Sequence, residues 1–460
     1  LSVVLSAILI VRILSVFLVQ TWYVPDEYWQ TLEVAHKQAF GYGALTWEWQ
    51  KGIRSYLYPS IVTALYYLLK VTNLDYPEAL VLLPRILQAI ISSAADYSFY
   101  KWSGNRKWAL FLILTSWFWF YTCSRTLLQT LETALVAIAL SLFPFKEGKL
   151  SHYQKACVSV FVRPTSAPLW IVLGLYNLVT TNQDRPKLLL QTYLPIGVLA
   201  GGALVALDSY FYGKLIITPW EFFKLNVLKD IASFYGKHPW HWYISQGLPA
   251  ILGINILPVV WGIVKILRRP KENKIGALLL SAAALHVALH RWQLYTLALA
   301  LLVGNAVPAA YFGLIHQKAT LEVMPLLREN ISNNRTSILF AMPCHSTPLY
   351  SHLHANVSTR YLSCDPPPPG ETYESGAFFN NPNRWWAREI AVRQPPTLVV
   401  LFDVLRGRLD ALRDYRLLHE LPHTQQFLIW SLSDQRSIFG RSRRFIILRA
   451  RVTLEILIHT

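Results

Sequence analysis

Apolar runs about as long as a bilayer is thick recur along most of this chain, and they constrain its fold more than any other feature. A membrane-spanning helix needs about 20 mostly apolar residues, and Leu1–Gln20 supplies such a run with Arg12 as its only charge. The last two of the further candidates could form one span or two, and several runs are shorter than about 20 residues and could be tilted pairs or re-entrant pieces. We therefore predict roughly nine to eleven spans. These further candidates are Tyr56–Val71, Glu78–Ser98, Trp108–Tyr121, Leu127–Phe145, Ala156–Val179, Leu188–Leu207, Tyr243–Leu267, Ile275–Leu289, Leu294–Val307 and Ala309–Ile315.

The composition agrees with a chain that lies mainly in lipid. Of the 460 residues, 15% are charged and 53% are hydrophobic, whereas soluble chains carry about 25% charged residues. The 17 tryptophans and 24 tyrosines suit two water–lipid interfaces, where amphipathic rings accumulate. We therefore predict an α-helical polytopic membrane protein whose surroundings are membrane lipids.

The formal net charge of +17 could indicate nucleic-acid binding or the positive-inside rule of membrane proteins. The basic residues cluster in short connections such as Lys101–Lys107 and Lys265–Lys274. Cytoplasmic loops between spans show this pattern. We therefore expect no nucleic-acid partner.

The composition changes near His316, and the rest of the chain has the character of a water-soluble α/β domain. Short apolar runs bounded by turn residues indicate buried strands, and they occur at Ser337–Ala341, Pro396–Phe402 and Gln426–Trp430. We predict a multispanning catalytic domain at 1–316, with a large first loop at 21–55, and a C-terminal domain at 317–460.

Glycosylation sequons and two cysteines favour a luminal position for the C-terminal domain. The sequons begin at Asn330, Asn334 and Asn356, and all three lie in this domain. Glycan addition requires a surface position in the secretory pathway. Cys344 and Cys364 could form a disulfide there, because that compartment is oxidising.

The first loop, Thr21–Ser55, is rich in aromatic residues and contains both acidic and basic groups. It is far longer than a simple connection of about two to eight residues. Asp26 and Glu27 directly follow the first span, and the helical spacing within Glu27–Phe40 predicts a helix along the membrane surface. Asp26 could be a helix N-cap, a role that is compatible with catalysis.

The motifs of this loop and of four later stretches resemble glycosyltransferase family 22. In the loop these motifs are VPDEYWQ from Val24, LEVAH from Leu32, FGYG from Phe40, LTWEW from Leu45 and RSY from Arg54. The later stretches are RPT from Arg163, DSYFYG from Asp208, FYG from Phe234 leading to HPWHWY from His238, and MPCHSTP from Met342. The resemblance covers most of the chain, and the loop and the HPWHWY stretch are its most specific parts.

The resemblance implies a GT-C membrane fold and an inverting mannosyltransferase that uses dolichyl-phosphate mannose in the endoplasmic reticulum. LTWEW, RSY and HPWHWY favour the members that add the third mannose, in α-1,2 linkage, to a GPI-anchor precursor. An alternative within the family is a member that acts on the dolichol-linked N-glycan precursor. The family also carries a His-Lys-Glu motif followed by Arg-Phe, where this chain has only HRWQLY from His290.

The expected reaction needs a base, because the acceptor hydroxyl must lose a proton while the anomeric carbon gains positive character. A carboxylate within hydrogen-bond reach contributes about 10²–10⁴-fold. Asp26 and Glu27 are the candidate catalytic residues, Asp26 first because it begins the loop where a lipid-borne donor presents its head. Glu27 or Glu33 could instead hold the acceptor sugar. Trp49 could stack on a sugar or belong to an interfacial aromatic belt.

The departing phosphate needs cationic partners, and Arg54, His36 and His290 are the candidates because charge-assisted hydrogen bonds to phosphate are strong. We expect no metal and no other cofactor, since the chain has no Asp-x-Asp triplet.

Other polar residues have an alternative role beside a catalytic one. His238 and His241 are interpreted as substrate contacts in an interfacial loop, and metal binding is the alternative role. A second group could also bind a metal: Cys344, His345, His352 and His354. Asp208 could contact substrate or cap a helix.

Two other classes of protein compete with the enzyme. Transporters place ionisable residues at mid-membrane around broken helices, whereas here charges lie at span ends and in the first loop, which favours an enzyme. An inactive scaffold subunit is the third alternative because of the altered late motif.

Overall fold

The structure is a computed structural model that describes most of the chain. The described residues are 2–142, 167–180, 185–229, 231, 248–268, 278, 308–331, 336–367, 373–391, 395–422 and 444–450. They pack into two compact units, and each is described below by itself. The helical unit comprises Leu1–Val19, Glu48–Leu65 and Leu82–Gly313, and the sheet unit comprises Gln20–Trp47, Tyr66–Val81 and Leu314–Thr460.

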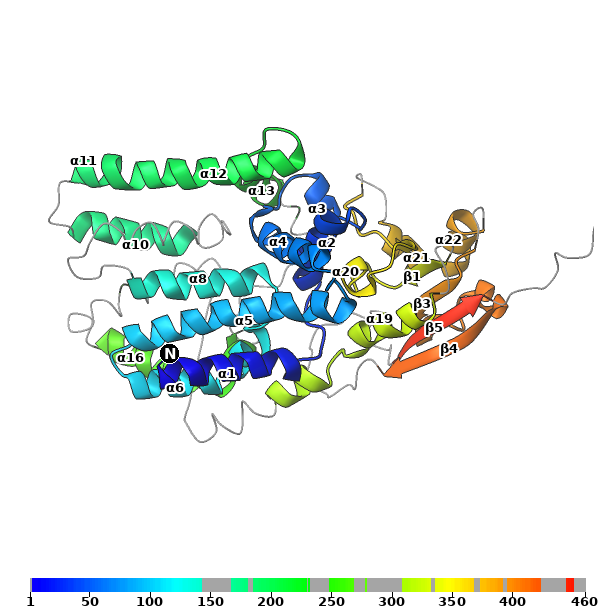
Figure 1. The fold of residues 1–460 in the computed structure, drawn as a ribbon, viewed down its shortest axis with the longest axis horizontal. Coiled ribbons are helices and arrows are strands. Elements are labelled where there is room, and N and C mark those ends of the chain that lie inside the picture. Colours follow the sequence, from blue (N-terminus) through cyan, green and yellow to red (C-terminus); the bar gives the residue numbers. More distant parts are fainter. Residues whose placement is uncertain are drawn as a thin grey trace, which may run out of the picture. The chain divides into compact units, whose positions relative to one another are not determined.

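The helical unit is built from apolar helices, several of which run in similar directions in Figure 1. Its α-helices are α1 (Val3–Leu18), α4 (Leu57–Val71), α5 (Pro77–Trp102), α6 (Arg106–Thr115), α7 (Trp117–Thr122), α8 (Leu128–Leu142), α10 (Ala167–Thr180), α11 (Arg185–Leu188), α12 (Leu194–Tyr212), α13 (Thr218–Phe223), α15 (Leu248–Leu252) and α16 (Ile256–Arg268). Three helices contribute residues to both units: the short helix α3 (Trp47–Gln50), α4 and α5. Two π-helical segments, η4 (Leu189–Tyr193) and η5 (Lys224–Leu228), and a 3₁₀ turn, η8 (Gly253–Asn255), interrupt the helices.

Helices occupy the predicted spans wherever the structure describes them. By length and composition two of them, Pro77–Trp102 and Arg185–Tyr212, could cross a membrane, and four shorter apolar helices accompany them. The predicted span Trp108–Tyr121 is divided into α6 and α7 at Ser116. The helices also expose large apolar side chains, for example Leu199, which is 73% exposed. Apolar exposure on this scale indicates a lipid-facing surface, and the number of spans stays a prediction.

A buried ion pair and its hydrogen bonds join four helices of this unit. Arg12 of α1 contacts Asp96 of α5, with Nε and Oδ2 2.7 Å apart, and neither side chain is exposed beyond 7%. The Arg12 guanidinium also donates to the carbonyl of Ile113 in α6 (2.7 Å), and the Trp119 indole of α7 donates to Asp96 (2.8 Å). Buried charges are tolerated when they are paired and hydrogen-bonded, so Arg12 fits within an otherwise apolar helix.

The sheet unit contains a five-stranded mixed sheet with the order β2-β1-β3-β5-β4. Its strands are β1 (Ser337–Ala341), β2 (Ser358–Tyr361), β3 (Leu398–Phe402), β4 (Tyr415–Pro422) and β5 (Arg444–Ala450). Strands β2, β1 and β3 are parallel, while β5 pairs antiparallel with both β3 and β4. The remaining elements are η1 (Tyr28–Leu32), α2 (Glu33–Phe40), α19 (Ala319–Glu329), α20 (Tyr350–Leu353), α21 (Glu374–Asn380), α22 (Pro382–Glu389), η9 (Asp403–Leu405) and η10 (Asp410–Asp414).

The central strands of the sheet unit are almost completely buried, which explains why they appear as short apolar runs in the sequence. All five residues of β3 and four of the five in β1 are buried, as expected for parallel strands covered on both faces. Alternate residues of β1 and β3 pack against α21 and α22, while α19 contacts β4 and β5 (Figure 1). The predicted strands at Ser337–Ala341 and Pro396–Phe402 are therefore confirmed. Gln426–Trp430 lies outside the described residues.

The first loop is divided between the two units. Residues 20–47 pack within the sheet unit, and Glu48–Leu65 packs within the helical unit. The sequence pattern places the whole loop in the membrane domain, so this grouping differs from the domain boundaries predicted at 316 and 317. The difference arises because polar side chains of the loop bind residues near 350, as described next.

Candidate active site

The candidate base Asp26 begins the main helix of the first loop. Pro25 immediately precedes this helix, and its carbonyl accepts hydrogen bonds from the amides of Tyr28 and Trp29, both at 3.0 Å. Asp26 therefore takes the first helical position, and not the N-cap position considered from the sequence. A carboxylate there is still favoured by the helix dipole. The next turn is the π-helical segment η1, and such segments occur frequently at functional sites.

Asp26 and Glu27 differ in accessibility. Asp26 is half-buried, whereas Glu27 is only 1% exposed. A group that takes a proton from a substrate must be reachable by that substrate. Of the two candidate catalytic carboxylates, the structure therefore favours Asp26.

The helix predicted for Glu27–Phe40 is present, but most of it is buried. It continues through η1 and α2, and every residue from Glu27 to His36 is buried. Trp29 illustrates the reason: its indole nitrogen donates to the carbonyl of Thr347 (3.0 Å), and its ring contacts His345 and Tyr361 at centroid distances of 4.5 and 5.0 Å. The burial differs from the exposed polar face of an amphipathic surface helix because C-terminal residues cover the helix, and its position along the membrane surface stays a prediction.

Glu33 binds the backbone at the start of helix α20. Its Oε1 accepts hydrogen bonds from the amides of Leu349 (2.7 Å) and Ser351 (3.1 Å) and from the Ser351 hydroxyl (2.5 Å). The side chain is fully buried, and this burial raises the pKa of Glu33 although the hydrogen bonds oppose the rise. Because these bonds hold the backbone near 350, we interpret Glu33 as a positioning residue and not as a sugar contact.

His36 is likewise buried and fully engaged. Its Nδ1 lies 3.2 Å from the carbonyl oxygen of Tyr42, and its Nε2 lies 3.0 Å from Nδ1 of His354. His354 in turn faces Asp75, with Nε2 and Oδ2 3.8 Å apart. A carbonyl only accepts, so Nδ1 of His36 must carry the proton and Nε2 must accept from His354. Both nitrogens are occupied, which leaves the predicted phosphate contact by His36 without support.

Burial, together with the neighbouring His354, lowers the pKa of His36 from 6.5 to about 3. Burial also lowers the pKa of His354, and Asp75 partly opposes that effect. His36 is therefore neutral at neutral pH, and the hydrogen-bonded chain through His354 depends on that neutral form.

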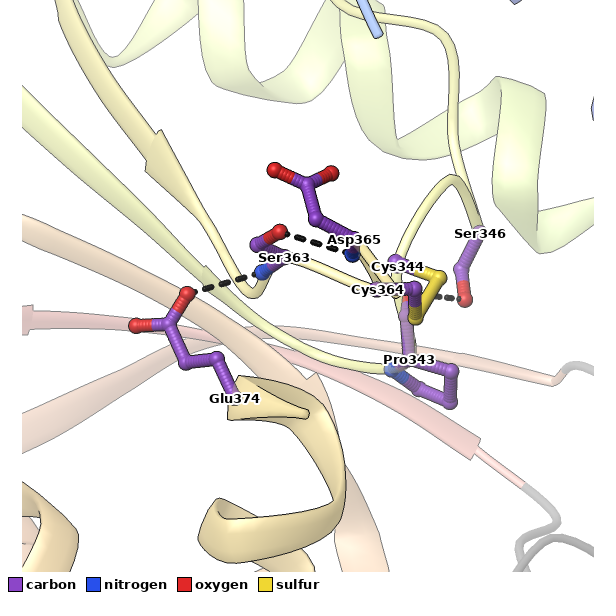
Figure 2. Close-up of a disulfide and its surroundings, with 7 residues drawn as sticks. All are labelled: Pro343, Cys344, Ser346, Ser363, Cys364, Asp365 and Glu374. Carbon is purple, nitrogen blue, oxygen red and sulfur yellow. Dashed lines mark hydrogen bonds between the residues drawn. A yellow bond between two sulfur atoms is a disulfide. The ribbon is translucent and has the colours of Figure 1, made fainter. Parts of the chain in front are cut away.

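The Cys344–Cys364 disulfide considered from the sequence is present, with 5.7 Å between the Cα atoms (Figure 2). Cys344 lies in the turn after β1, in which the Ser346 hydroxyl and amide donate to the Pro343 carbonyl at 2.6 and 3.3 Å. The alternative metal site loses Cys344 as a ligand, because a thiolate is needed to bind metal.

On the Cys364 side, the preceding residue Ser363 fixes the loop. Its amide donates to the carboxylate of Glu374 (2.8 Å), and its hydroxyl accepts from the amide of Asp365 (3.0 Å), as Figure 2 shows. Glu374 also pairs with Arg360 of β2 at 2.9 Å. The disulfide therefore joins two loops that are both held by further hydrogen bonds.

Three candidate residues, Arg54, Trp49 and Asp208, belong to the helical unit. Arg54 pairs with Glu48 (Nη2–Oε1, 2.5 Å), and both side chains are mostly buried. Trp49 is only 2% exposed and contacts the Tyr56 ring at 4.7 Å. The low exposure of Trp49 argues for packing within the unit over sugar stacking or an interfacial belt.

Asp208 has the capping role considered from the sequence. It is fully buried, and its carboxylate accepts from the Ser55 hydroxyl (3.1 Å), the Tyr56 amide (2.8 Å) and the Thr218 hydroxyl (2.5 Å). These bonds join the end of α12 to the start of α4 and of α13.

Some of the remaining predicted residues lie outside the part of the chain that the structure describes. His238, His241, His290 and Asn334 lie outside the described residues. Asn356 is exposed, as a glycan acceptor must be. Asn330 is half-buried, and its amide donates to the carbonyl of Leu326 (2.8 Å).

Sequence reasoning missed residues that surround the first loop, above all Ser351 and Tyr361. The resemblance had drawn attention to MPCHSTP but not to its spatial neighbours. The available signal was the polar content of the loop itself: a buried helix with Glu33 and His36 requires hydrogen-bonding partners from elsewhere.

Comparisons with known proteins agree with these motifs. The model of the Alg9-like mannosyltransferase family matches residues 3–289 and 275–354. GPI mannosyltransferase 3 of Drosophila melanogaster is 45% identical over 91% of this chain and 83% of its own length. GPI alpha-1,2-mannosyltransferase 3 of Homo sapiens is 36% identical over 87% of this chain and 79% of its own length. Mannosyltransferase APTG1 of Arabidopsis thaliana is 34% identical over 90% of this chain and 87% of its own length.

One solved structure has a similar fold. The crystal structure of ArnT from Cupriavidus metallidurans bound to undecaprenyl phosphate aligns over 98% of both chains with a TM-score of 0.50. At 12% identity, this likeness concerns the fold alone.

We predict that the folded state loses stability as the pH falls from about 6.5 toward 3 because of His36. The unfolded state binds a proton on this residue below its ordinary pKa of 6.5, whereas the folded state does so only near 3. The contribution of His36 to the free energy of unfolding is therefore fully present above pH 6.5. Below that pH the free energy of unfolding declines by up to about 1.4 kcal/mol per pH unit. Thermal unfolding of purified protein between about pH 5 and 7.5 measures the slope. His36→Gln removes the titrating group, so an unchanged slope in that variant would contradict the assignment.

Proposed function

This chain belongs to the Alg9-like mannosyltransferase family, and from that premise we propose that it is a GPI α-1,2-mannosyltransferase of the endoplasmic reticulum. It transfers the third mannose from dolichyl-phosphate mannose to a GPI-anchor precursor. The observation that carries the proposal is that relatives from fly, human and zebrafish that match this chain over most of its length are all named GPI mannosyltransferase 3. These names also favour an enzyme over a transporter.

In the proposed reaction the acceptor hydroxyl attacks the anomeric carbon of the donor mannose. A new C–O bond forms as the bond between that carbon and the phosphate oxygen breaks, and dolichyl phosphate leaves with the electron pair. The hydroxyl proton passes to the Asp26 carboxylate. The support for Asp26 is its partial exposure at the first position of a helix whose following residues are buried. Single displacement inverts the β-linked donor to an α-linked product.

The leaving phosphate needs positive charge, and Arg54 is our proposed contact. Its guanidinium is oriented by Glu48, and a guanidinium presents five N–H donors in a fixed planar arrangement. His290 remains a second proposed contact. The late motif around His290 lies outside the described residues.

The decisive experiment replaces Asp26 in a cell line that lacks its own enzyme. Asp26→Asn keeps the size of the side chain and removes the proton acceptor, so turnover should fall by about 10²-fold or more. The lost interaction with the helix dipole should cost only about 0.3–1 kcal/mol. Surface GPI-anchored proteins and precursor glycolipids are measured by flow cytometry and mass spectrometry, normalised to protein abundance. Without rescue, a precursor with two mannoses should accumulate.

Glu27→Gln is the matched control for Asp26→Asn, because it makes the same chemical change one residue further along the chain. If Asp26 is the base, loss of turnover at normal abundance should follow the Asp26 variant. Full rescue by Asp26→Asn, with loss in Glu27→Gln at normal abundance, would assign the base to Glu27.

We also propose that no divalent metal takes part, since the departing phosphate is a monoester and the chain has no Asp-x-Asp triplet. Mannose transfer in microsomes should therefore continue in excess EDTA. Loss of transfer in EDTA that Mn²⁺ or Mg²⁺ restores would contradict this proposal.

The proposed topology has the first loop and the C-terminal domain in the lumen. Asn356 is exposed within a sequon, so endoglycosidase should increase the gel mobility of the expressed protein. Asn356→Gln should reduce that shift, because it removes an acceptor and little else. In intact microsomes the C-terminal domain should resist added protease. Its digestion without detergent would place the domain on the cytoplasmic side.

A further inference from the structure

The turn after β1 lies at the edge of the sheet where the parallel strands end. β1 and β2 are parallel neighbours, so their carboxyl ends share one edge, and the disulfide joins the loops that follow them. In open α/β sheets, ligands bind at the carboxyl ends of parallel strands. His345 lies in the first of these loops, and Tyr361 is the last residue of β2. Neither residue has a role in the reaction proposed above.

The backbone of His345 has an uncommon conformation. Its φ is +59°, in the left-handed region that few residues other than glycine adopt. The adjacent disulfide and the hydrogen bonds from Ser346 to Pro343 hold the turn in this form. Strained residues of this kind cluster at functional sites, so the contacts of the His345 side chain bear directly on function.

The His345 ring packs on the residue that anchors the catalytic helix. Its centroid is 4.5 Å from the ring of Trp29, which also contacts Tyr361 at 5.0 Å. Trp29 is fixed further by its hydrogen bond to the Thr347 carbonyl, at 3.0 Å. Trp29 follows Asp26 by three residues in the same continuous helical stretch, so a shift of Trp29 also displaces the turn that begins at Asp26.

The charges agree with this arrangement. Burial lowers the pKa of His345 to about 4, and the Asp26 carboxylate opposes the effect. The imidazole is therefore uncharged at neutral pH.

We propose that His345 is a positioning residue for the transfer reaction: its ring, held by the disulfide-closed turn, fixes Trp29 and thereby the helical turn that carries Asp26. This inference rests on the proposed function, in which Asp26 is the base. Displacement of a catalytic group by about 1 Å can reduce the rate about 10²-fold. The turn around His345 thus controls how well Asp26 meets the acceptor hydroxyl.

The principal test is His345→Gly in full-length protein assayed in microsomes. Glycine adopts a φ of +59° without strain, so the turn should persist while the ring is lost. We expect a folded protein with reduced thermal stability, because loss of the ring leaves a gap beside Trp29. After correction for abundance, kcat should fall by about 10²-fold while the KM values for donor and acceptor stay unchanged. Asn73→Gly is the matched control, because Asn73 also has a positive φ (+55°) and lies in an exposed turn. A normal kcat for His345→Gly would overturn the proposal.

Two further variants separate positioning from direct substrate contact. His345→Phe keeps a ring against Trp29 and should restore most of the kcat lost in the glycine variant, after correction for abundance. His345→Asn suits the backbone and keeps a polar group, but lacks the ring, so it should resemble the glycine variant. The opposite ranking, with Asn active and Phe inactive, would mean that the imidazole N–H binds substrate, and the positioning proposal would be wrong.

An assay of the unsubstituted chain distinguishes a wrong inference about His345 from a wrong proposed function. Mass spectrometry should detect mannose transfer to the two-mannose GPI precursor in its presence. If the unsubstituted chain forms no such product, the proposed function itself is wrong, and the role of His345 falls with it. If product forms and the glycine variant matches it in kcat, only the inference about His345 is overturned.

Discussion

One buried carboxylate, that of Glu33, organises much of the sheet unit. It accepts hydrogen bonds from Leu349 and Ser351, more than 300 residues further along the chain. A buried charged or polar group without such bonds would be costly, so the helix of the first loop can be buried only when the segment near 350 is in place. The contacts of Trp29 and His36 follow from the same docking. Asp26 lies at the start of this docked helix.

The sequence predicted those parts of the fold that depend on local pattern. Apolar runs located the helices, and two short apolar segments located β1 and β3, because a strand buried on both faces needs no alternation. The loop helix was also predicted, but its burial was not. Its spacing suggested one apolar face, whereas Glu33 and His36 are buried through hydrogen bonds to distant residues. Hydrophobic periodicity does not report partners of this kind.

The candidate site shows the same division between local and distant information. The type and position of Asp26 suggested a base, and the resemblance in VPDEYWQ pointed to the same residue. The polar roles of Asp208 and Arg54 became specific only when the structure gave them partners, Thr218 and Glu48. From the sequence, His345 belonged to a group of four possible metal ligands. Its contact with Trp29, more than 300 residues away, depends on a turn whose geometry no local pattern encodes.

The distance along the chain between Glu33 and Ser351 also has a consequence for biosynthesis. Translation proceeds at about 5–20 residues per second, so roughly 15–60 s separate the synthesis of the two segments. During that interval the loop helix has been made but cannot bury its carboxylate, its imidazole or its tryptophan. A nascent chain in this state presents apolar and unsatisfied polar surface, which chaperones bind. Truncated chains that end before residue 349 would therefore remain in this state permanently and be substrates for degradation.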